Sequence, residues 1–313
     1  MKTSFLVFLF LFSYVSLFSQ RAVDVTYNQD AQGNYTFSCL NKAFCDYILQ
    51  VNFSMLENAK SDHALPFVVE VKPGPAKLFR LSKEKVADPI QLKYGYTSFK
   101  GCLSPVVDTG FVYVLPIAPG KETQAYEIQS AGKKTADGKI VKDWYGIRLR
   151  MKPGDTIYAA RRGVVTDLNV SSGQNDAGVS GPDGDNYIEI VHKDCSFAEY
   201  GIIKKDGAFV HPGQVVEAGQ PIGLVGGDKF GRGSEARLSV TYNQVRDDAS
   251  NSGGTGIYAV YVPLKFWTKQ NGKGMLRHGG TYISEHPANL LTQEISKPAP
   301  KKRKPPVKGG KSA

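Results

Sequence analysis

The stretch HPGQVVEAGQPIGLVGG, residues 211–227, decides the predicted fold of the second half of the chain. Glycine and proline separate short apolar runs in it, and GRGSEARLSVTY, residues 231–242, follows as a glycine-rich loop that leads into an alternating strand. Further short runs of the same kind precede it: YGIRLRM, DTIYAA, GVVTDLNV, DNYIEIVHK and FAEYGII. Repeated short strands with glycine and proline turns, and almost no helical period, predict an all-β domain over residues 144–290.

The first half of the chain also predicts strands, including VDVTY, NYTFSC, YILQVNFSM and LPFVVEVKPG. Apolar side chains at Tyr47, Leu49, Val51 and Phe53 alternate with polar neighbours, as half-buried antiparallel strands require. A chain of 313 residues is long enough for about two domains. We therefore expect a β-sandwich over residues 21–121.

Two polar segments interrupt the series of predicted strands. Residues 122–143, which include AGKKTADGK, are rich in lysine, glycine and alanine, and they predict a linker between the two domains. SSGQNDAGVSGPDGDN, residues 171–186, predicts a long polar loop that can rim a binding surface.

The N-terminus has the features of a secretory signal peptide over residues 1–20. One basic residue precedes an apolar run from Phe5 to Leu17, and small or polar residues come before Arg21. A membrane anchor is the alternative, but the run is shorter than the roughly 20 residues that span a bilayer. We expect an exported protein without a membrane span, in the periplasm or outside the cell.

Four cysteines in an exported chain are able to form disulfides, and four allow three connectivities. The segment TFSCLNKAFCDYILQV predicts two strands around a turn, which favours a disulfide between Cys39 and Cys45. Cys102 and Cys195 then bridge the domains or stay as thiols. The alternative is that some of the four are only small buried residues.

The formal net charge of +10 resembles that of a nucleic-acid-binding protein, but most of this charge lies in one segment of the chain. Seven of these charges lie in KPAPKKRKPPVKGGKSA at the C-terminus, which leaves +3 for the rest of the chain. Residues 291–313 are therefore predicted to form a disordered basic tail, because proline, glycine and lysine bury too little apolar surface. Export excludes a nucleic-acid partner, and the tail is suited to anionic surfaces or is simply solvated.

The second domain resembles the lysostaphin and LytM-type zinc endopeptidases, which cut peptide crosslinks in bacterial peptidoglycan. KPGDTIYAARRGVVTDL, DNYIEIVHKDCSFAEYGII and HPGQVVEAGQPIGLVGG carry the resemblance, in the family's order, from Trp144 to Tyr242. It implies a duplicated-hybrid-motif β-sheet or barrel-like domain after the N-terminal β-sandwich.

The family's catalytic residues are not matched. Its zinc-binding Asp falls on Arg148, and the His partner of that Asp falls on Trp144 or Val141. The His of the family's Tyr-x-His strand falls on Ile202, and its His-x-His strand is Arg237, Leu238, Ser239. The candidate ligand groove is therefore made of four residues at the former active-site positions: Arg148, Ile202, Arg237 and Ser239.

Physical chemistry argues against zinc at these positions. Catalytic zinc takes about three protein ligands from Cys, His, Asp or Glu, and arginine is always protonated with no lone pair to donate. At about 4 Å and an effective dielectric of about 20, one guanidinium would repel Zn²⁺ by roughly 8 kcal/mol. We expect no zinc, no catalytic residue and no other cofactor. His192 is expected to be structural, and Glu235 to be solvated.

The resulting hypothesis is a catalytically inactive homologue of these peptidases that binds or regulates in the cell envelope. Its partner would be peptidoglycan or another envelope polymer or protein, because two arginines suit bidentate recognition of a carboxylate. The alternatives are salt bridges across a collapsed groove, a divergent zinc endopeptidase acting on peptidoglycan crosslinks, and a scaffold or activator of another envelope protein.

Overall fold

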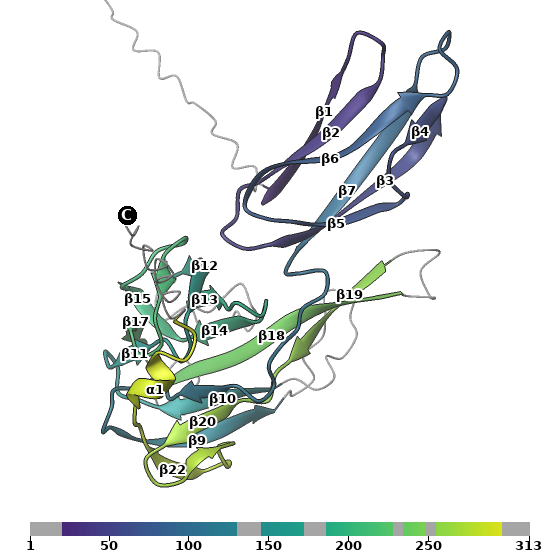
Figure 1. Ribbon diagram of the computed structural model, residues 1–313. Helices are drawn as coiled ribbons and strands as arrows, with labels where there is room; N and C mark the ends of the chain where they lie inside the picture. The colour runs from purple at the N-terminus through teal and green to yellow at the C-terminus, as the bar shows by residue number, and fades with distance from the viewer. Residues whose placement is uncertain (1–20, 130–144, 172–185, 228–233, 248–254, 296–313) are drawn as a thin grey trace, which may run out of the picture. The chain divides into compact units, whose positions relative to one another are not determined.

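A computed structural model describes residues 21–129, 145–171, 186–227, 234–247 and 255–295 (Figure 1). The described chain is nearly all β, with one short helix, α1 (Ala288–Leu291), so the predicted fold class is confirmed. No helix in these ranges has the length and apolar composition to cross a membrane. The predicted signal peptide lies outside the described residues.

The chain divides into two compact units. Unit 1 comprises Met1–Ala43 with Leu49–Ser98, and unit 2 comprises Phe44–Ile48 with Phe99–Ala313. The N-terminal domain thus ends earlier than the predicted residue 121. Leu115 and Ile117 explain the difference, because both are fully buried in the core of unit 2.

Unit 1 is built from two sheets. One has the order β1-β2-β6-β4 and the other β5-β3-β7. The strands are β1 (Val23–Gln29), β2 (Tyr35–Asn41), β3 (Tyr47–Glu57), β4 (Ala59–Ser61), β5 (Phe67–Val71), β6 (Gly74–Lys83) and β7 (Gln91–Lys100).

Aromatic side chains join the two sheets of unit 1. Phe37 of β2 stacks on Phe79 of β6 with ring centroids 4.6 Å apart, and it meets Tyr94 of β7 edge to face at 5.2 Å. In β3, Leu49 and Val51 are fully buried and alternate with the more exposed Gln50 and Asn52, as predicted, whereas Ile48 before them is also buried. The two sheets with this core form a β-sandwich.

Unit 2 is organised around a nine-stranded sheet of order β16-β12-β13-β14-β18-β10-β9-β22, with β19 paired to β18. Its strands are β9 (Glu122–Gln129), β10 (Tyr145–Arg150), β12 (Gly163–Asn169), β13 (Tyr187–Val191), β14 (Phe197–Gly201), β16 (Val215–Val216), β18 (Glu235–Asp247), β19 (Thr255–Tyr261) and β22 (Gly280–Ile283). Two three-stranded sheets accompany it, made of β8 (Val112–Val114), β11 (Thr156–Tyr158), β15 (Ile203–Ala208), β17 (Pro221–Val225), β20 (Lys265–Thr268) and β21 (Gly272–Gly274).

The large sheet has two different faces. Ile147, Ile188 and Leu238 lie on the inner face and are buried in one core with Ile157 of β11 and Val225 of β17. The alternate residues of the same strands lie on the opposite face, which we call the outer face. The outer face carries the charged side chains of β10, β13, β14 and β18.

Close packing explains the glycine that begins GVVTDLNV, which forms β12. A Cβ at Gly163 would collide with the Val191 carbonyl oxygen and the Ile190 side chain. Only glycine fits where β12 passes β13 this closely.

The predicted linker is wrong in its first part. Glu122–Gln129 forms β9, which is hydrogen-bonded between β10 and β22. Polar composition concealed an alternation with Ala125 buried and Tyr126 on the outer face. Residues 130–143, and most of the predicted loop 171–186, lie outside the described residues.

The predicted start of the tail is also too early. Leu291 packs against Gly219, where a Cβ would lie 2.7 Å from Leu291 Cδ2. Glu294 pairs with the buried side chain of Arg161. These contacts place residues 291–295 with unit 2, and the rest of the tail lies outside the described residues.

The predicted Cys39–Cys45 disulfide is wrong. Cys102 is bonded to Cys195, both in unit 2, while Cys39 and Cys45 are buried thiols. The prediction assumed that the strands around residues 39 and 45 pair with each other. In the structure, β2 lies between β1 and β6, whereas β3 lies between β5 and β7.

Candidate functional site

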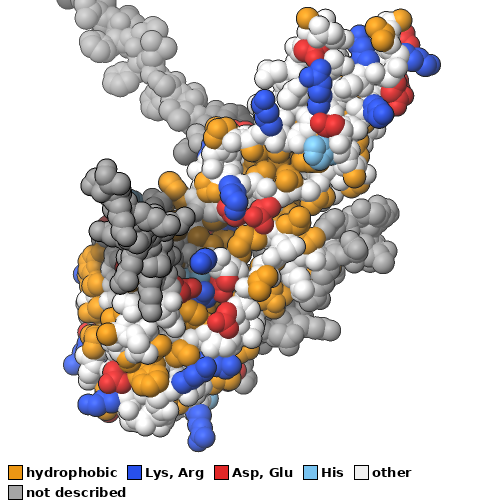
Figure 2. Space-filling view, in the orientation of Figure 1, with side chains coloured by type: hydrophobic (Ala, Val, Ile, Leu, Met, Phe, Trp, Pro, Cys, Tyr) orange, Lys and Arg blue, Asp and Glu red, His pale blue; other side chains and the backbone are white. Residues whose placement is uncertain are grey.

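The outer face brings two of the predicted groove residues together. Arg148 of β10 lies directly opposite Arg237 of β18, and Arg237 lies opposite Gly201 of β14. Figure 2 shows basic and acidic side chains side by side over β14 and the adjacent part of β18. The strand register therefore places two of the predicted groove positions, Arg148 and Arg237, in one row.

A carboxylate joins the two arginines. Glu235 Oε2 lies 3.2 Å from Arg148 Nη1, and Glu235 Oε1 lies 2.9 Å from Arg237 Nε. The exposed fractions of the side chains are 16% for Arg148, 25% for Arg237 and 4% for Glu235. We call this cluster the Arg148–Glu235–Arg237 triad.

The prediction that Glu235 is solvated is wrong, because the structure buries its side chain between the two arginines. Glu235 and Arg237 are two positions apart on β18, so their side chains lie on one face of the strand. This two-residue spacing is the feature of the sequence that could have predicted the Glu235–Arg237 pair. A buried carboxylate between two guanidiniums forms charge-assisted hydrogen bonds, which are stronger than neutral ones.

Tyr126 supports the triad from the neighbouring strand. The Arg148 guanidinium carbon lies 4.5 Å from the centroid of the Tyr126 ring, and that of Arg150 lies 5.6 Å away. Tyr126 is directly opposite Arg148 in the pairing of β9 with β10. This cation–π contact orients Arg148 without using its remaining N–H donors.

The other two predicted residues play smaller parts. Ser239 lies opposite Glu199, one row along the outer face from Arg237. Ile202 is 5% exposed and has a φ of +66°. A β-branched residue is strained in this left-handed region, and its carbonyl accepts a 2.8 Å hydrogen bond from Gly226 N. The structure does not place the Ile202 side chain in contact with the triad.

The residues present do not fit a zinc ion. The matched positions offer two guanidiniums, an aliphatic side chain and a hydroxyl, and the nearby Glu235 carboxylate is bound by both arginines. Within the described part of the outer face, no three His, Cys, Asp or Glu side chains converge as metal ligands. Trp144 and Val141 lie outside the described residues.

His192 is fixed inside the domain. Its Nδ1 lies 2.8 Å from the Arg162 carbonyl oxygen, and the side chain is buried. Burial, followed by the charge of Arg161, lowers the pKa of His192 to about 3. A neutral, buried imidazole that is bonded to the backbone is a structural group.

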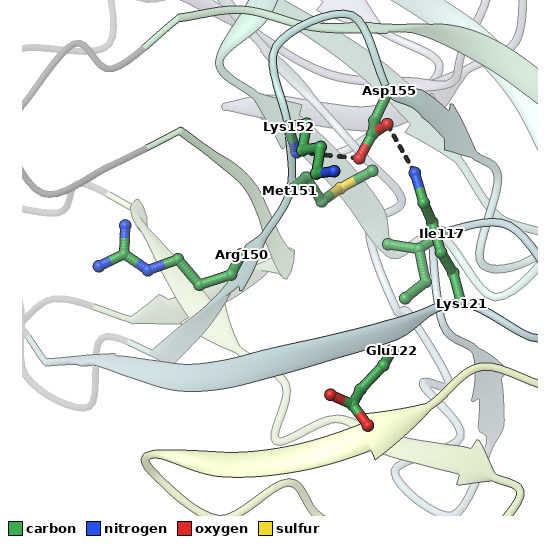
Figure 3. Close-up of a pocket in the computed structure, with 7 residues that line it drawn as sticks. All are labelled: Ile117, Lys121, Glu122, Arg150, Met151, Lys152 and Asp155. Carbon is green, nitrogen blue, oxygen red and sulfur yellow. Dashed lines mark hydrogen bonds and ion pairs between the residues drawn. The ribbon is translucent and has the colours of Figure 1, made fainter.

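Unit 2 also has a cavity of about 260 Å³ beside β9 and β10, lined by Ile117, Lys121, Glu122, Arg150, Met151, Lys152 and Asp155 (Figure 3). The Lys121 ammonium lies 2.6 Å from the Asp155 carboxylate. The Arg150 side chain extends away from that ion pair. None of the triad residues lines this cavity, so the cavity does not support a ligand-binding site at the triad.

Residues 142–251, which include β10, β14 and all of β18, match the model of Peptidase family M23. This segment of unit 2 is therefore similar to the M23 peptidase domain, as the resemblance to the lysostaphin and LytM-type enzymes implied. No curated protein matches the chain.

Several solved structures are similar to this chain. The catalytic domain of a mutant of the prophage-encoded M23 protein EnpA from Enterococcus faecalis is 22% identical, with a TM-score of 0.27, and the match covers 40% of this chain and 87% of that one. For a zinc-containing peptidase from Vibrio cholerae the identity is 13%, the TM-score 0.30 and the coverage 69% and 81%. For Csd3 from Helicobacter pylori these values are 14%, 0.29, 75% and 77%.

Proposed function

We propose that this protein is a catalytically inactive M23 homologue that is exported and binds a component of the bacterial cell envelope through the outer face of unit 2. The observation that carries the proposal is the Arg148–Glu235–Arg237 triad, whose two arginines stand at positions matched to a zinc ligand and to the general base of the family. A pair of arginines there replaces metal chemistry with anion recognition.

The charges of the triad support a carboxylate ligand. Two guanidiniums and one carboxylate sum to one positive charge, so Glu235 neutralises only part of the pair. Each guanidinium has five N–H donors in a planar fork that matches a carboxylate. Because both arginine side chains are partly exposed, a ligand can reach them from the outer face. Peptidoglycan stem peptides and protein C-termini both offer such a carboxylate.

Two further features support export. The predicted signal peptide directs the chain out of the cytoplasm. The Cys102–Cys195 disulfide is of the kind that persists in oxidising compartments. The basic tail would add a long-range attraction to anionic envelope polymers.

Co-sedimentation with purified sacculi tests the proposal. Charge reversal in the double variant Arg148→Glu/Arg237→Glu should lower the bound fraction by about tenfold or more, because it turns an attractive site into a repulsive one. The matched control is Lys204→Glu/Lys205→Glu, which makes the same charge change at exposed positions of β15. Equal binding by the wild type and both variants would rule out the triad as the binding site.

The same assay separates the alternatives. Release of soluble peptidoglycan fragments by the wild type would favour the divergent zinc endopeptidase. Absence of sacculus binding, combined with co-purification of one envelope protein that depends on Arg148 and Arg237, would favour the scaffold or activator.

A further inference from the structure

Two short segments of unit 2 lie on the outer face away from the triad. They are residues 44–48 and 99–102, and together we call them the strap. Lys100 Nζ lies 2.7 Å from Glu189 Oε1 on β13 and 3.5 Å from Asp167 Oδ2 on β12. The Gly101 N–H donates to the Asp46 carbonyl at 2.8 Å, which joins the two segments.

The strap covers an apolar side chain of the outer face. Phe197 precedes Glu199 by two positions on β14, so both lie on this face, but Phe197 is only 6% exposed. A Cβ on Gly101 would lie 3.8 Å from the Phe197 ring. Asn243 of β18 donates to the Lys100 carbonyl at 2.6 Å. The strap thus reaches over β12, β13, β14 and β18.

Gly101 is required where the strap passes over these strands. Its φ of +120° is open to glycine and strained for other residues. A Cβ at this position would make ordinary van der Waals contacts with Phe197 and Asn243. The backbone conformation, and not the space above the sheet, therefore favours glycine here.

One covalent bond fastens the strap. Cys102 at its end is bonded to Cys195, which lies between β13 and β14 and 93 residues further along the chain. The other attachments include hydrogen bonds, the ion pairs of Lys100, and the packing of Cys45 and Ile48, which are 4% and 2% exposed. The disulfide is the covalent cross-link between the strap and the sheet, and it is the attachment that a reductant removes.

Cys45 lies within the strap, so the accessibility of its thiol shows whether the strap is in contact with the sheet. Its thiol is 4% exposed. Burial raises the pKa of Cys45 to about 12, and Lys100 and Glu189 are among the charged groups near it. A reagent can reach this thiol only if the strap moves away from the sheet.

We propose that the strap is a redox-dependent cover of the outer face. With the Cys102–Cys195 disulfide intact, the strap is seated on β12 to β14. An external dithiol reduces this disulfide to two thiols and is itself oxidised to a disulfide, and the strap then leaves the face. Its departure exposes Asp167, Glu189 and Phe197, so an acidic and apolar surface opens on the same face as the triad.

Thiol labelling of the full chain tests this proposal. In Cys102→Ser/Cys195→Ser the only thiols are those of Cys39 and Cys45, which are labelled with iodoacetamide and quantified by peptide mass spectrometry. We expect Cys45 to react at least about tenfold faster than in the oxidised wild type, because thiol reactivity follows exposure. Cys39 is the internal control, since it is buried in unit 1 and should stay as slow as in the wild type.

A second variant separates the disulfide from the ion pairs. Lys100→Met with the disulfide intact should raise the labelling rate of Cys45 less than the double serine variant does. Wild-type protein kept in a dithiol reductant should match the double variant. The proposal is overturned if Cys45 stays as protected as in the oxidised wild type. It is also overturned if Cys39 and Cys45 become reactive together, because the disulfide would then hold the whole fold and not the strap.

Discussion

Unit 2 contains two arginine–carboxylate clusters that differ in composition and place. The Arg148–Glu235–Arg237 triad has two arginines and one carboxylate on the outer face. The second cluster has one arginine and two carboxylates: Arg161 Nη1 lies 2.8 Å from Asp194, and Arg161 Nη2 lies 2.7 Å from Glu294. The Arg161 guanidinium also lies 3.9 Å from the centroid of the Phe111 ring, and its side chain is 3% exposed.

The difference shows which cluster is suited to a ligand. Arg161 donates to two carboxylates and is sealed from solvent, so it ties the C-terminal residues to the domain and offers nothing to a partner. The triad keeps a net positive charge and partly exposed donors. Its position on a sheet face also leaves it accessible. The Arg161 cluster is therefore expected to affect stability most, and the triad to affect binding most.

Removal of Arg161 should produce the largest loss of stability. Arg161→Met leaves Asp194 and Glu294 buried without their counter-ion, and breaking a buried pair in this way costs about 3–5 kcal/mol. Both tryptophans, Trp144 and Trp267, belong to unit 2, so denaturant unfolding followed by tryptophan fluorescence reports on this unit. A loss below about 1 kcal/mol would show that the cluster is not a structural tie.

The buried cluster should also make unit 2 sensitive to acid. Burial and Arg161 lower the pKa of His192 from 6.5 to about 3, so between these pH values the unfolded state binds a proton that the folded state does not. Stability is fully present above pH 6.5 and falls as the pH falls toward 3, by up to about 1.4 kcal/mol per pH unit.

Asp194 extends the loss of stability to lower pH. Burial alone would raise its pKa, but hydrogen bonds from Ser196 and the charge of Arg161 lower the pKa below its ordinary value. Its stabilisation is lost as the pH falls through that depressed pKa. His192→Gln should reduce the loss of unfolding free energy between pH 6.5 and 4.5 by about 1–2 kcal/mol, measured by denaturant unfolding at each pH. An unchanged pH profile would contradict the assignment of this effect to His192.

Removal of the shared carboxylate should separate stability from binding in the triad. Glu235→Gln removes the carboxylate that both guanidiniums bind, and we expect it to cost about 1–2 kcal/mol in unfolding free energy. The same change raises the charge of the triad from one to two, so the fraction bound to sacculi should increase. Decreased binding by a folded Glu235→Gln variant would indicate that Glu235 itself contacts the ligand.

The smallest effect is expected at Ser239. It lies one row from Arg237 and is neither an ion-pair partner nor fully buried. Ser239→Ala should change the unfolding free energy by less than about 0.5 kcal/mol and sacculus binding by less than about twofold. A tenfold loss of binding would extend the ligand contact along β18 beyond the triad.

Local patterns were sufficient to predict the fold class. The alternation in β3 can be recognised within one short segment, and the strand formed where this pattern indicated. The same kind of evidence misled at residues 122–129, because the polar composition of β9 conceals a strand that is stabilised by β10 and β22. Composition does not reveal pairing with distant strands.

The charged clusters could be predicted only in part. Placing Arg148 and Arg237 together required the family's strand order, but Glu235 is 87 residues from Arg148, and Glu294 is 133 residues from Arg161. No local signal links residues so far apart in the chain. The cysteines show the same difficulty, since sequence proximity favoured Cys39 with Cys45 while the fold joins Cys102 to Cys195.

Zinc stoichiometry is the most direct test of the claim that the triad has replaced a metal centre. The purified full chain is incubated with excess zinc, desalted and measured by elemental analysis. We predict far less than one zinc per chain, because the matched positions offer no adequate ligand set. About one tightly held zinc per wild-type chain would contradict this claim.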